Sequence, residues 1–200
     1  GSTLLFGSVA AIRNVGNPIL VARRVMEATP HCLLVGEGAT AFAREQGFAG
    51  VSDEELIAGA VSGPDSATGT VGAVARDTEG HIAAATSTGG IKQKIPGRVG
   101  DSPLIGCGAI AEDGVGGVSA TGEGEKLMRV MMARTVTDFL KSGLDAQAAC
   151  EAAVRELEGR AKGRGGVICL DARGEVGFAC NTSHLARAWL DRQNVVQVEI

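Results

Sequence analysis

Thr70 stands directly after Gly69, the last residue of a turn-rich segment, and begins an apolar run, TVGAVARD. A threonine hydroxyl is protonated at pH 7 and attacks a carbonyl poorly unless a base takes its proton. When a threonine begins a chain, its own α-amine, with a pKa of about 8, can be that base. Cleavage between Gly69 and Thr70 would create this amine, and glycine can adopt the strained backbone that cleavage requires. A threonine that merely begins a strand is the ordinary alternative, so a catalytic Thr70 needs support from other residues.

The stretch STGGIKQKIPGRVGDSP supplies two such residues. Arg98 lies between two glycines that permit a tight turn, and Asp101 follows three residues later. A guanidinium can bind a carboxylate through two hydrogen bonds, and an aspartate can accept hydrogen bonds from an ammonium group. The pair therefore fits the head group of an amino acid. The alternative is a loop ion pair between Arg98 and Asp101, which contributes about 0 to 1 kcal/mol when exposed.

The stretch SATGEGE leads from an expected strand into an expected long helix. Gly122 and Gly124 leave main-chain N–H groups accessible near the helix N-terminus, and Thr121 adds a hydroxyl. Such donors could stabilise an oxyanion or bind a substrate. The alternative is that Thr121 only caps the helix, and Glu125 is interpreted as a first-turn charge favoured by the helix dipole.

The remaining reactive side chains predict neither a metal site nor a cofactor site. The glycines near TGEGE have the wrong spacing for a dinucleotide-binding loop. The histidines show no metal spacing, and surface or capping roles are expected for His31, His81 and His184. Five cysteines without CxxC spacing, mostly in apolar surroundings, predict reduced and buried thiols at Cys32, Cys107, Cys150, Cys169 and Cys180.

Composition predicts one globular domain over residues 1–200. The chain is 44% hydrophobic and 21% charged, with a net charge of −4 and no basic stripe, so a nucleic-acid partner is not expected. It contains no apolar run of about eighteen residues and begins without a charged leader, so neither a membrane span nor secretion is indicated and the cytoplasm is expected.

Hydrophobic periodicity and turn residues predict blocks of helices that alternate with blocks of strands. Helices are expected over 17–28, 38–47, 52–58, 121–143 and 145–159. A short strand or a buried connector is expected over 31–36. Strands are expected in a buried hairpin of 70–77 and 81–88, over 115–120, and in a closing hairpin within 165–181 that turns at 171–174. The segment 59–69 is expected to be exposed and cleavable. Segregated blocks favour an α+β sandwich of mainly antiparallel strands.

In this order, the motifs GTVGAVARD, AAATSTGG, PGRVGDSPLIGCGAIA and SATGEGE, with NPILVARRVMEATPH upstream, closely resemble the plant-type asparaginase and isoaspartyl peptidase family of N-terminal nucleophile hydrolases. The resemblance covers nearly the whole chain. It implies an αββα sandwich that cleaves itself before Thr70, giving an α-subunit-like part, 1–69, and a β-subunit-like part, 70–200. It also implies a homo-oligomer, a dimer of these αβ units.

The resemblance further implies a reaction that needs no cofactor. Thr70 attacks a side-chain amide or isopeptide carbonyl of L-asparagine or a β-aspartyl dipeptide, and an acyl-enzyme is then hydrolysed. The implied site consists of the nucleophile Thr70, the orienting hydroxyl of Thr88, the oxyanion-hole and substrate positions Thr121 and Gly122, the main-chain contact Gly124, and the clamps Arg98 and Asp101 on the substrate α-carboxylate and α-amine.

A departure from the family pattern and a likeness to a related enzyme leave two alternatives open. The family's upstream His-Gly-Gly and Asn-Ala-Gly motifs are not in this sequence, so we expect the sandwich to lack part of its N-terminal portion. A truncated or unprocessed relative without activity is therefore one alternative. A glycosylasparaginase is the other, favoured by LLVGEGATAFAREQGF and IKQKIPGRVGDSP, although its nucleophile normally follows an aspartate rather than Gly69.

Overall fold

The computed structural model describes residues 1–58 and 69–200, and the elements alternate between helices and strands as an α+β protein. The helices are α1 (Pro18–Ala28), α2 (Gly36–Glu45), α3 (Asp53–Ala58), α4 (Gly124–Val130), α5 (Met132–Lys141) and α6 (Ala146–Ala161). The strands are β1 (Ser8–Ala10), β2 (Leu33–Val35), β3 (Thr70–Arg76), β4 (Ile82–Thr88), β5 (Ala109–Glu112), β6 (Gly116–Gly122), β7 (Gly165–Asp171), β8 (Val176–Cys180), β9 (Arg187–Leu190) and β10 (Val196–Glu199). The α+β class expected from the sequence is confirmed, while most of the expected cleavable segment, 59–68, lies outside the described residues.

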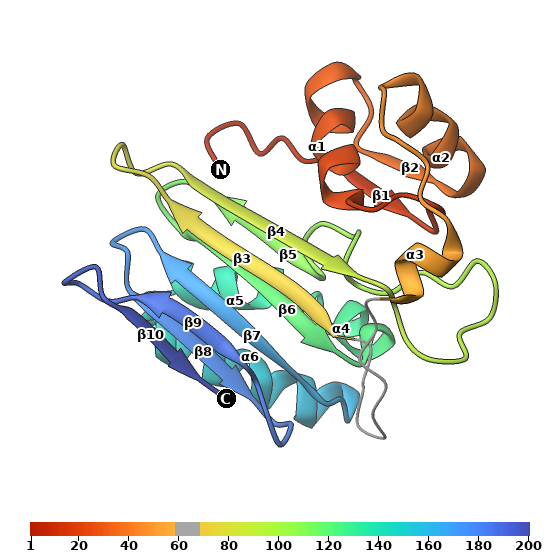
Figure 1. Ribbon diagram of the computed structural model, residues 1–200. Helices are drawn as coiled ribbons and strands as arrows, with labels where there is room; N and C mark the ends of the chain where they lie inside the picture. The colour runs from red at the N-terminus through yellow and green to blue at the C-terminus, as the bar shows by residue number, and fades with distance from the viewer. Residues whose placement is uncertain (59–68) are drawn as a thin grey trace.

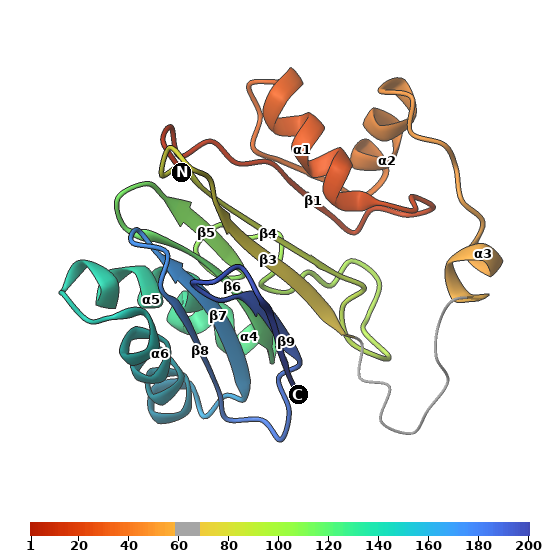
Figure 2. The same cartoon turned by 60° about the vertical axis from the view of Figure 1, so that its left-hand side comes forward.

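An antiparallel sheet in the order β5-β6-β7-β8 forms the centre of the molecule. Helices α4, α5 and α6 cover one face of this sheet, and the hairpin β3–β4 packs on the other face (Figures 1 and 2). The main apolar core lies between the helices and the sheet and includes Leu127, Met132, Leu157 and Val167, all nearly inaccessible to solvent. On the hairpin side the Thr86 and Ser119 hydroxyls are 2.6 Å apart, so a polar contact joins the two layers.

Strand register and the packing of the hairpin on the central sheet bring the ends of four strands to one corner of the molecule. Thr70 at the start of β3 lies opposite Thr88 at the end of β4, and Gly122 at the end of β6 lies opposite Gly165 at the start of β7. In Figure 1 the start of β3 lies beside the end of β6 and the start of α4. The residues that the sequence selects for chemistry are therefore gathered at this corner.

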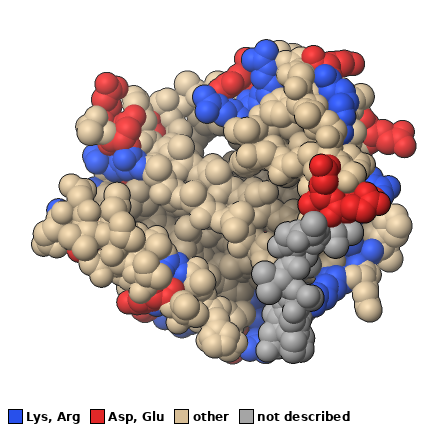
Figure 3. Space-filling model, viewed as in Figure 1, with Lys and Arg blue, Asp and Glu red and all other residues tan. Residues whose placement is uncertain are grey.

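The N-terminal part, with β1, β2, α1 and α2, lies beside β4. A hollow of about 750 Å³ separates it from the sheets, and Figure 3 shows this opening in the molecular face. The segment 31–36, expected to be a strand or a buried connector, forms the strand β2. It pairs only with β1 among the described residues, and Leu33 and Val35 are exposed.

Local sequence signals are confirmed at two helix starts. Pro18 occupies the first turn of α1 directly after Asn17. Before α3, the Ser52 N–H donates to the Glu55 carboxylate at 2.9 Å and the Glu55 N–H donates to the Ser52 hydroxyl at 3.2 Å. This reciprocal pair is a capping box.

The single helix expected over 121–143 is wrong, because Met131 adopts a left-handed conformation with φ of 47° and divides it into α4 and α5. The break frees N–H groups in the first turn of α5. The Ala133 N–H donates to the Cys107 carbonyl at 3.2 Å, and the Arg134 N–H donates to the Gly106 carbonyl at 2.8 Å. The start of α5 therefore holds the loop that follows Asp101.

Burial departs from expectation in two further places. The hairpin β3–β4 is not uniformly buried, since most residues of β3 are exposed and Val71 is 70% exposed. The five cysteines are free thiols, and Cys107, Cys150 and Cys169 are buried as expected, whereas Cys32 is exposed and Cys180 is half-buried. His31 and His184 are exposed, and His81 pairs with Asp113 at 2.7 Å on the surface, which confirms their expected structural placement.

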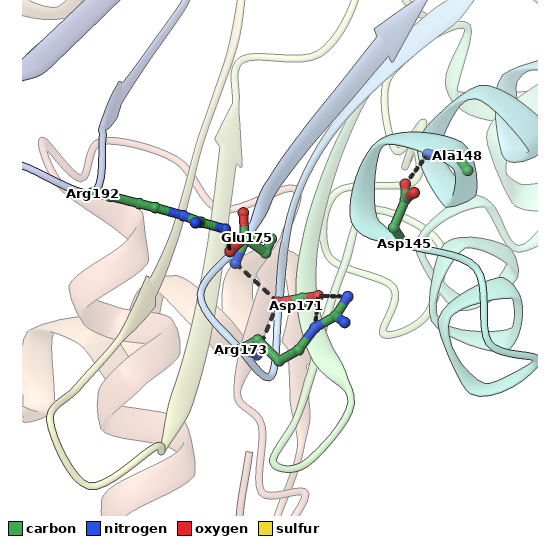
Figure 4. A network of polar contacts seen from close by, with 6 residues as sticks. All are labelled: Asp145, Ala148, Asp171, Arg173, Glu175 and Arg192. Carbon is green, nitrogen blue, oxygen red and sulfur yellow. Dashed lines mark hydrogen bonds and ion pairs between the residues drawn. The ribbon is translucent and has the colours of Figure 1, made fainter.

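Strands β1, β5, β9 and β10 are missing from the sequence prediction, and the hairpin of β9 and β10 is joined to the β7–β8 turn (Figure 4). At this turn Asp171 accepts the backbone N–H groups of Arg173 and Glu175 at 2.8 and 2.9 Å and pairs with the Arg173 guanidinium. Arg192, which follows β9, forms an ion pair with Glu175. These contacts lie at the end of β7 away from Gly165.

In residues 1–58 and 69–200, every helix is too short or too polar to cross a bilayer.

Candidate active site

A cavity of about 380 Å³ opens at the corner where β3, β4 and β6 meet. Its wall combines residues from both layers of strands with the loop 90–102. The lining residues are Thr70, Thr88, Gly90, Ile91, Arg98, Gly100, Asp101, Ser102, Thr121, Gly122, Glu123, Arg164 and Thr182. Six of the residues selected from the sequence are among them; Gly69 adjoins Thr70, and Gly124 lies behind the wall.

The two threonines meet because of the hairpin register. Thr70 and Thr88 are directly opposite in β3 and β4, so their side chains project from the same face of the hairpin. The Thr70 hydroxyl donates to the Thr88 hydroxyl oxygen at 3.4 Å, and the Gly90 N–H donates to the same oxygen at 3.0 Å. Thr88 is thus held by main chain while it contacts Thr70.

Arg98 is held by Glu125. The loop ion pair between Arg98 and Asp101, which the sequence offers as an alternative, does not form between these two described residues. The Arg98 Nε and Nη2 donate to the two Glu125 carboxylate oxygens, each at 2.8 Å. These hydrogen bonds lower the pKa of Glu125 to about 2 and raise that of Arg98. Glu125 therefore does more than neutralise a helix dipole, because it fixes the plane of the guanidinium at the cavity wall.

Asp101 is a buried carboxylate with an unused oxygen. It is 6% exposed, and its Oδ2 has no hydrogen-bond partner among the described residues. Burial raises its pKa to about 6, which the nearby Arg98 charge only partly offsets. Buried polar atoms are normally satisfied, so this oxygen, beside the cavity, is suited to receive a donor from a bound molecule.

The loop that carries Asp101 is anchored both to α5 and to the central sheet. Its Gly106 and Cys107 carbonyls accept the first N–H groups of α5, and its Gly108 carbonyl accepts the Ala120 N–H of β6 at 2.8 Å. Gly124 brings α4 close to the same loop, since a Cβ there would lie 2.8 Å from Arg98 Nη2 and 2.9 Å from Asp101 Oδ1. Gly124 is thus a packing position behind the two charged residues.

The end of β6 requires glycine at position 122. Gly122 has φ of 143°, and a Cβ there would lie 2.4 Å from the Arg164 carbonyl oxygen. This conformation turns the chain from β6 toward α4 beside Thr121, which lines the cavity. The arrangement places a hydroxyl and main chain opposite Thr70, where an oxyanion could be stabilised.

Sequence reasoning missed several residues of this wall. Ile91 and Thr182 belong to no motif that indicates a site. Gly122 and Gly124 are selected from the sequence, whereas Glu123 between them is not. Arg164 could have been found, because it directly precedes the expected strand at Gly165, and antiparallel pairing of that strand with the SATG segment would bring it to the same corner. Within the described part of the chain, no group of His, Cys, Asp or Glu side chains could hold a metal ion.

Comparison with known proteins supports, over most of the chain, the family resemblance that the sequence motifs indicate. The family model described as Asparaginase matches residues 1–62 and 57–200. The chain is 46% identical over 216 residues to a plant-type L-asparaginase of Pyrococcus abyssi, covering 95% of this chain and 70% of that protein. It is 44% identical to an isoaspartyl peptidase of Salmonella typhimurium, with coverage of 94% and 67%, and 42% identical to an isoaspartyl peptidase/L-asparaginase of Xenopus laevis, with coverage of 94% and 65%. The chain thus spans about two thirds of the length of these relatives.

Proposed function

Because the chain belongs to the plant-type asparaginase and isoaspartyl peptidase family, we propose that it hydrolyses the side-chain amide of L-asparagine or the isopeptide bond of β-aspartyl dipeptides. The observation that carries the proposal is the contact of Thr70 with Thr88 in a cavity that also contains Arg98 and Asp101. A nucleophile, a carboxylate clamp and an ammonium acceptor in one cavity match an amino-acid amide substrate.

The proposed first step is self-cleavage. The Thr70 hydroxyl oxygen attacks the Gly69 carbonyl carbon, the peptide C–N bond breaks as the hydroxyl proton passes to the freed Thr70 nitrogen, and the acyl group remains on the hydroxyl oxygen as an ester. Water then hydrolyses the ester, which leaves a carboxylate on Gly69 and a free amine on Thr70. Residues 1–69 and 70–200 become the α-like and β-like parts, and we propose that these assemble as an αββα sandwich and as a dimer of αβ units.

In the proposed turnover the Thr70 amine takes the hydroxyl proton as the oxygen attacks the substrate carbonyl. The resulting oxyanion is stabilised by the Thr121 hydroxyl and main chain near Gly122. The amine returns the proton to the leaving ammonia or amino acid, and an aspartyl ester remains on Thr70. Water, deprotonated by the same amine, hydrolyses this ester and releases aspartate. Thr88 orients the nucleophile throughout.

Mass spectrometry on the purified protein tests the cleavage, and substrate assays test the activity. We expect two fragments that meet between Gly69 and Thr70, and release of aspartate from L-asparagine and a β-aspartyl dipeptide. A chain that stays whole and inactive after long incubation contradicts the proposal and favours the unprocessed relative. Faster hydrolysis of a glycosylated asparagine than of the two other substrates favours the glycosylasparaginase alternative.

The pH dependence of substrate capture is expected to follow Asp101. The ionised carboxylate receives the substrate ammonium, so kcat/KM falls about tenfold per pH unit below the Asp101 pKa of about 6. Stability changes in the opposite sense: the folded pKa lies above the ordinary value of 3.8, so protonation stabilises the fold as pH falls below about 6.

Two comparisons isolate Asp101 in this pH profile. Succinamate, which is asparagine without its α-amine, lacks the group that Asp101 binds and should show no limb near pH 6. The unfolding free energy of Asp101→Asn should lack the rise below about pH 6 that the unsubstituted protein is expected to show. The same acidic limb with succinamate as with asparagine would refute the role of Asp101.

A further inference from the structure

Arg164 is a second arginine on the wall of the cavity, and its environment differs from that of Arg98. Arg98 is bound on two nitrogens by Glu125. The Arg164 guanidinium is exposed, and in the described ranges it has no hydrogen bond or ion pair to another residue. The cavity therefore presents one arginine held by the protein and one whose donors remain available.

The backbone around Arg164 is fixed even though its side chain is free. Its N–H donates to the Glu123 carboxylate at 2.7 Å, and its carbonyl accepts the Glu123 N–H at 2.9 Å. On either side of it, Asn181 accepts the Gly165 N–H at 2.8 Å and donates to the Gly163 carbonyl at 2.9 Å. These four bonds hold the Cα of Arg164 at the end of β6, next to the turn at Gly122.

The Glu123 carboxylate does not neutralise the guanidinium. It accepts the Arg164 main-chain N–H and lies farther than 4 Å from the guanidinium nitrogens, since no ion pair forms between the two side chains in the part of the chain that is described. A positive side chain on a fixed backbone position, at the opening of the cavity, is suited to bind an anionic group of a molecule already seated there.

We propose that Arg164 forms a subsite for the carboxylate of the leaving amino acid in β-aspartyl dipeptides, a proposal that rests on the proposed function. Such a dipeptide carries two carboxylates, one on its aspartyl half and one on the amino acid released. Arg98 and Asp101 suit the aspartyl head group, which places the leaving half beyond the attacked carbonyl. Arg164 adjoins the end of β6 beside the proposed oxyanion donors and lines the same cavity, and since Arg98 is already engaged with the aspartyl half, Arg164 is the lining arginine left for the leaving half.

The subsite distinguishes between substrates of the same enzyme. Asparagine releases ammonia, which carries no carboxylate, whereas a dipeptide gains a charge-assisted contact with Arg164. A hydrogen bond to a charged group at an exposed position corresponds to an increase of about tenfold in kcat/KM for the dipeptide that carries the carboxylate. The preference should weaken as ionic strength rises, because the guanidinium is exposed to solvent.

The test compares a β-aspartyl dipeptide that has a free C-terminal carboxylate with the same dipeptide as its C-terminal amide. In the unsubstituted protein kcat/KM should favour the free acid by about tenfold, in Arg164→Gln the two substrates should become nearly equal, and in Arg164→Glu the amide should be favoured. Arg164→Lys keeps the charge and should retain part of the preference. Arg160→Gln is the matched control, because Arg160 is an exposed arginine of α6 that pairs with Glu156 outside the cavity.

The outcomes separate this inference from the function on which it rests. A protein that hydrolyses asparagine and both dipeptides without preferring the free acid overturns the subsite and leaves the proposed function in place. A preference that survives in Arg164→Gln overturns it equally. Absence of turnover with all substrates overturns the proposed function, and the subsite with it.

Discussion

Thr70→Ala is expected to yield a single uncleaved chain and to lower kcat/KM for asparagine and β-aspartyl dipeptides by at least about 10⁴-fold, because loss of a nucleophile removes the covalent route entirely. Alanine keeps the strand position but has no hydroxyl to attack the Gly69 carbonyl or a substrate. The contact of the Thr70 hydroxyl with Thr88 at 3.4 Å is lost at the same time. Intact-mass measurement and an aspartate-release assay on the same preparation follow both effects.

Two variants control this experiment. Thr70→Ser keeps the hydroxyl and should still cleave and turn over, more slowly, since the methyl group that restricts the side-chain rotamer is gone. Thr78→Ala changes an exposed threonine at the other end of the same hairpin and should behave as the unsubstituted protein. Cleavage of the Thr70→Ala chain at the same bond would show that Thr70 does not perform it.

The sequence predicts those parts of the fold that local chemistry determines. The capping box of Ser52 and Glu55, the proline at the start of α1 and the turn at Asp171 each depend on residues a few positions apart, and all three form as expected. The division of the helix at Met131 has no such signal. It depends on the carbonyls of Gly106 and Cys107, which come from a distant loop.

The candidate site shows the same division between local and distant information. Motif order selects Thr70, Thr88 and Asp101, and the hairpin register explains how the two threonines meet. The partner of Arg98 could not be predicted from the loop alone, because Asp101 is near in sequence while Glu125 is brought close by the turn at the end of β6. Spatial neighbours of this kind follow only from the packing of the layers.

The Arg98–Glu125 pair and Asp101 form one electrostatic unit. Glu125 keeps its charge because two hydrogen bonds from Arg98 hold its pKa at about 2, while the buried Asp101 has a pKa near 6. The Arg98 guanidinium is therefore oriented by the ionised Glu125 carboxylate, and the neighbouring Asp101 ionises most readily when a cation lies beside it. This arrangement suits a zwitterionic head group better than a simple anion, because both its charges find partners.

Arg98→Ala is expected to reduce kcat/KM for asparagine and β-aspartyl dipeptides by about 10² to 10³-fold, mainly through KM, while cleavage between Gly69 and Thr70 proceeds. The substrate carboxylate loses its bidentate partner, and Glu125 is left as an unpaired anion beside it, so attraction is replaced by repulsion. Self-cleavage needs no substrate carboxylate and should be unaffected.

Arg98→Lys and Arg23→Ala complete the comparison for Arg98. Lysine keeps the charge but not the planar pair of donors, so it should recover only part of the lost kcat/KM. Arg23→Ala removes an arginine that pairs with Glu27 on α1, away from the cavity, and should leave KM unchanged. Steady-state kinetics with asparagine and intact-mass measurement distinguish the outcomes: an unchanged KM in Arg98→Ala refutes the clamp, and a chain that no longer cleaves places Arg98 in self-cleavage instead.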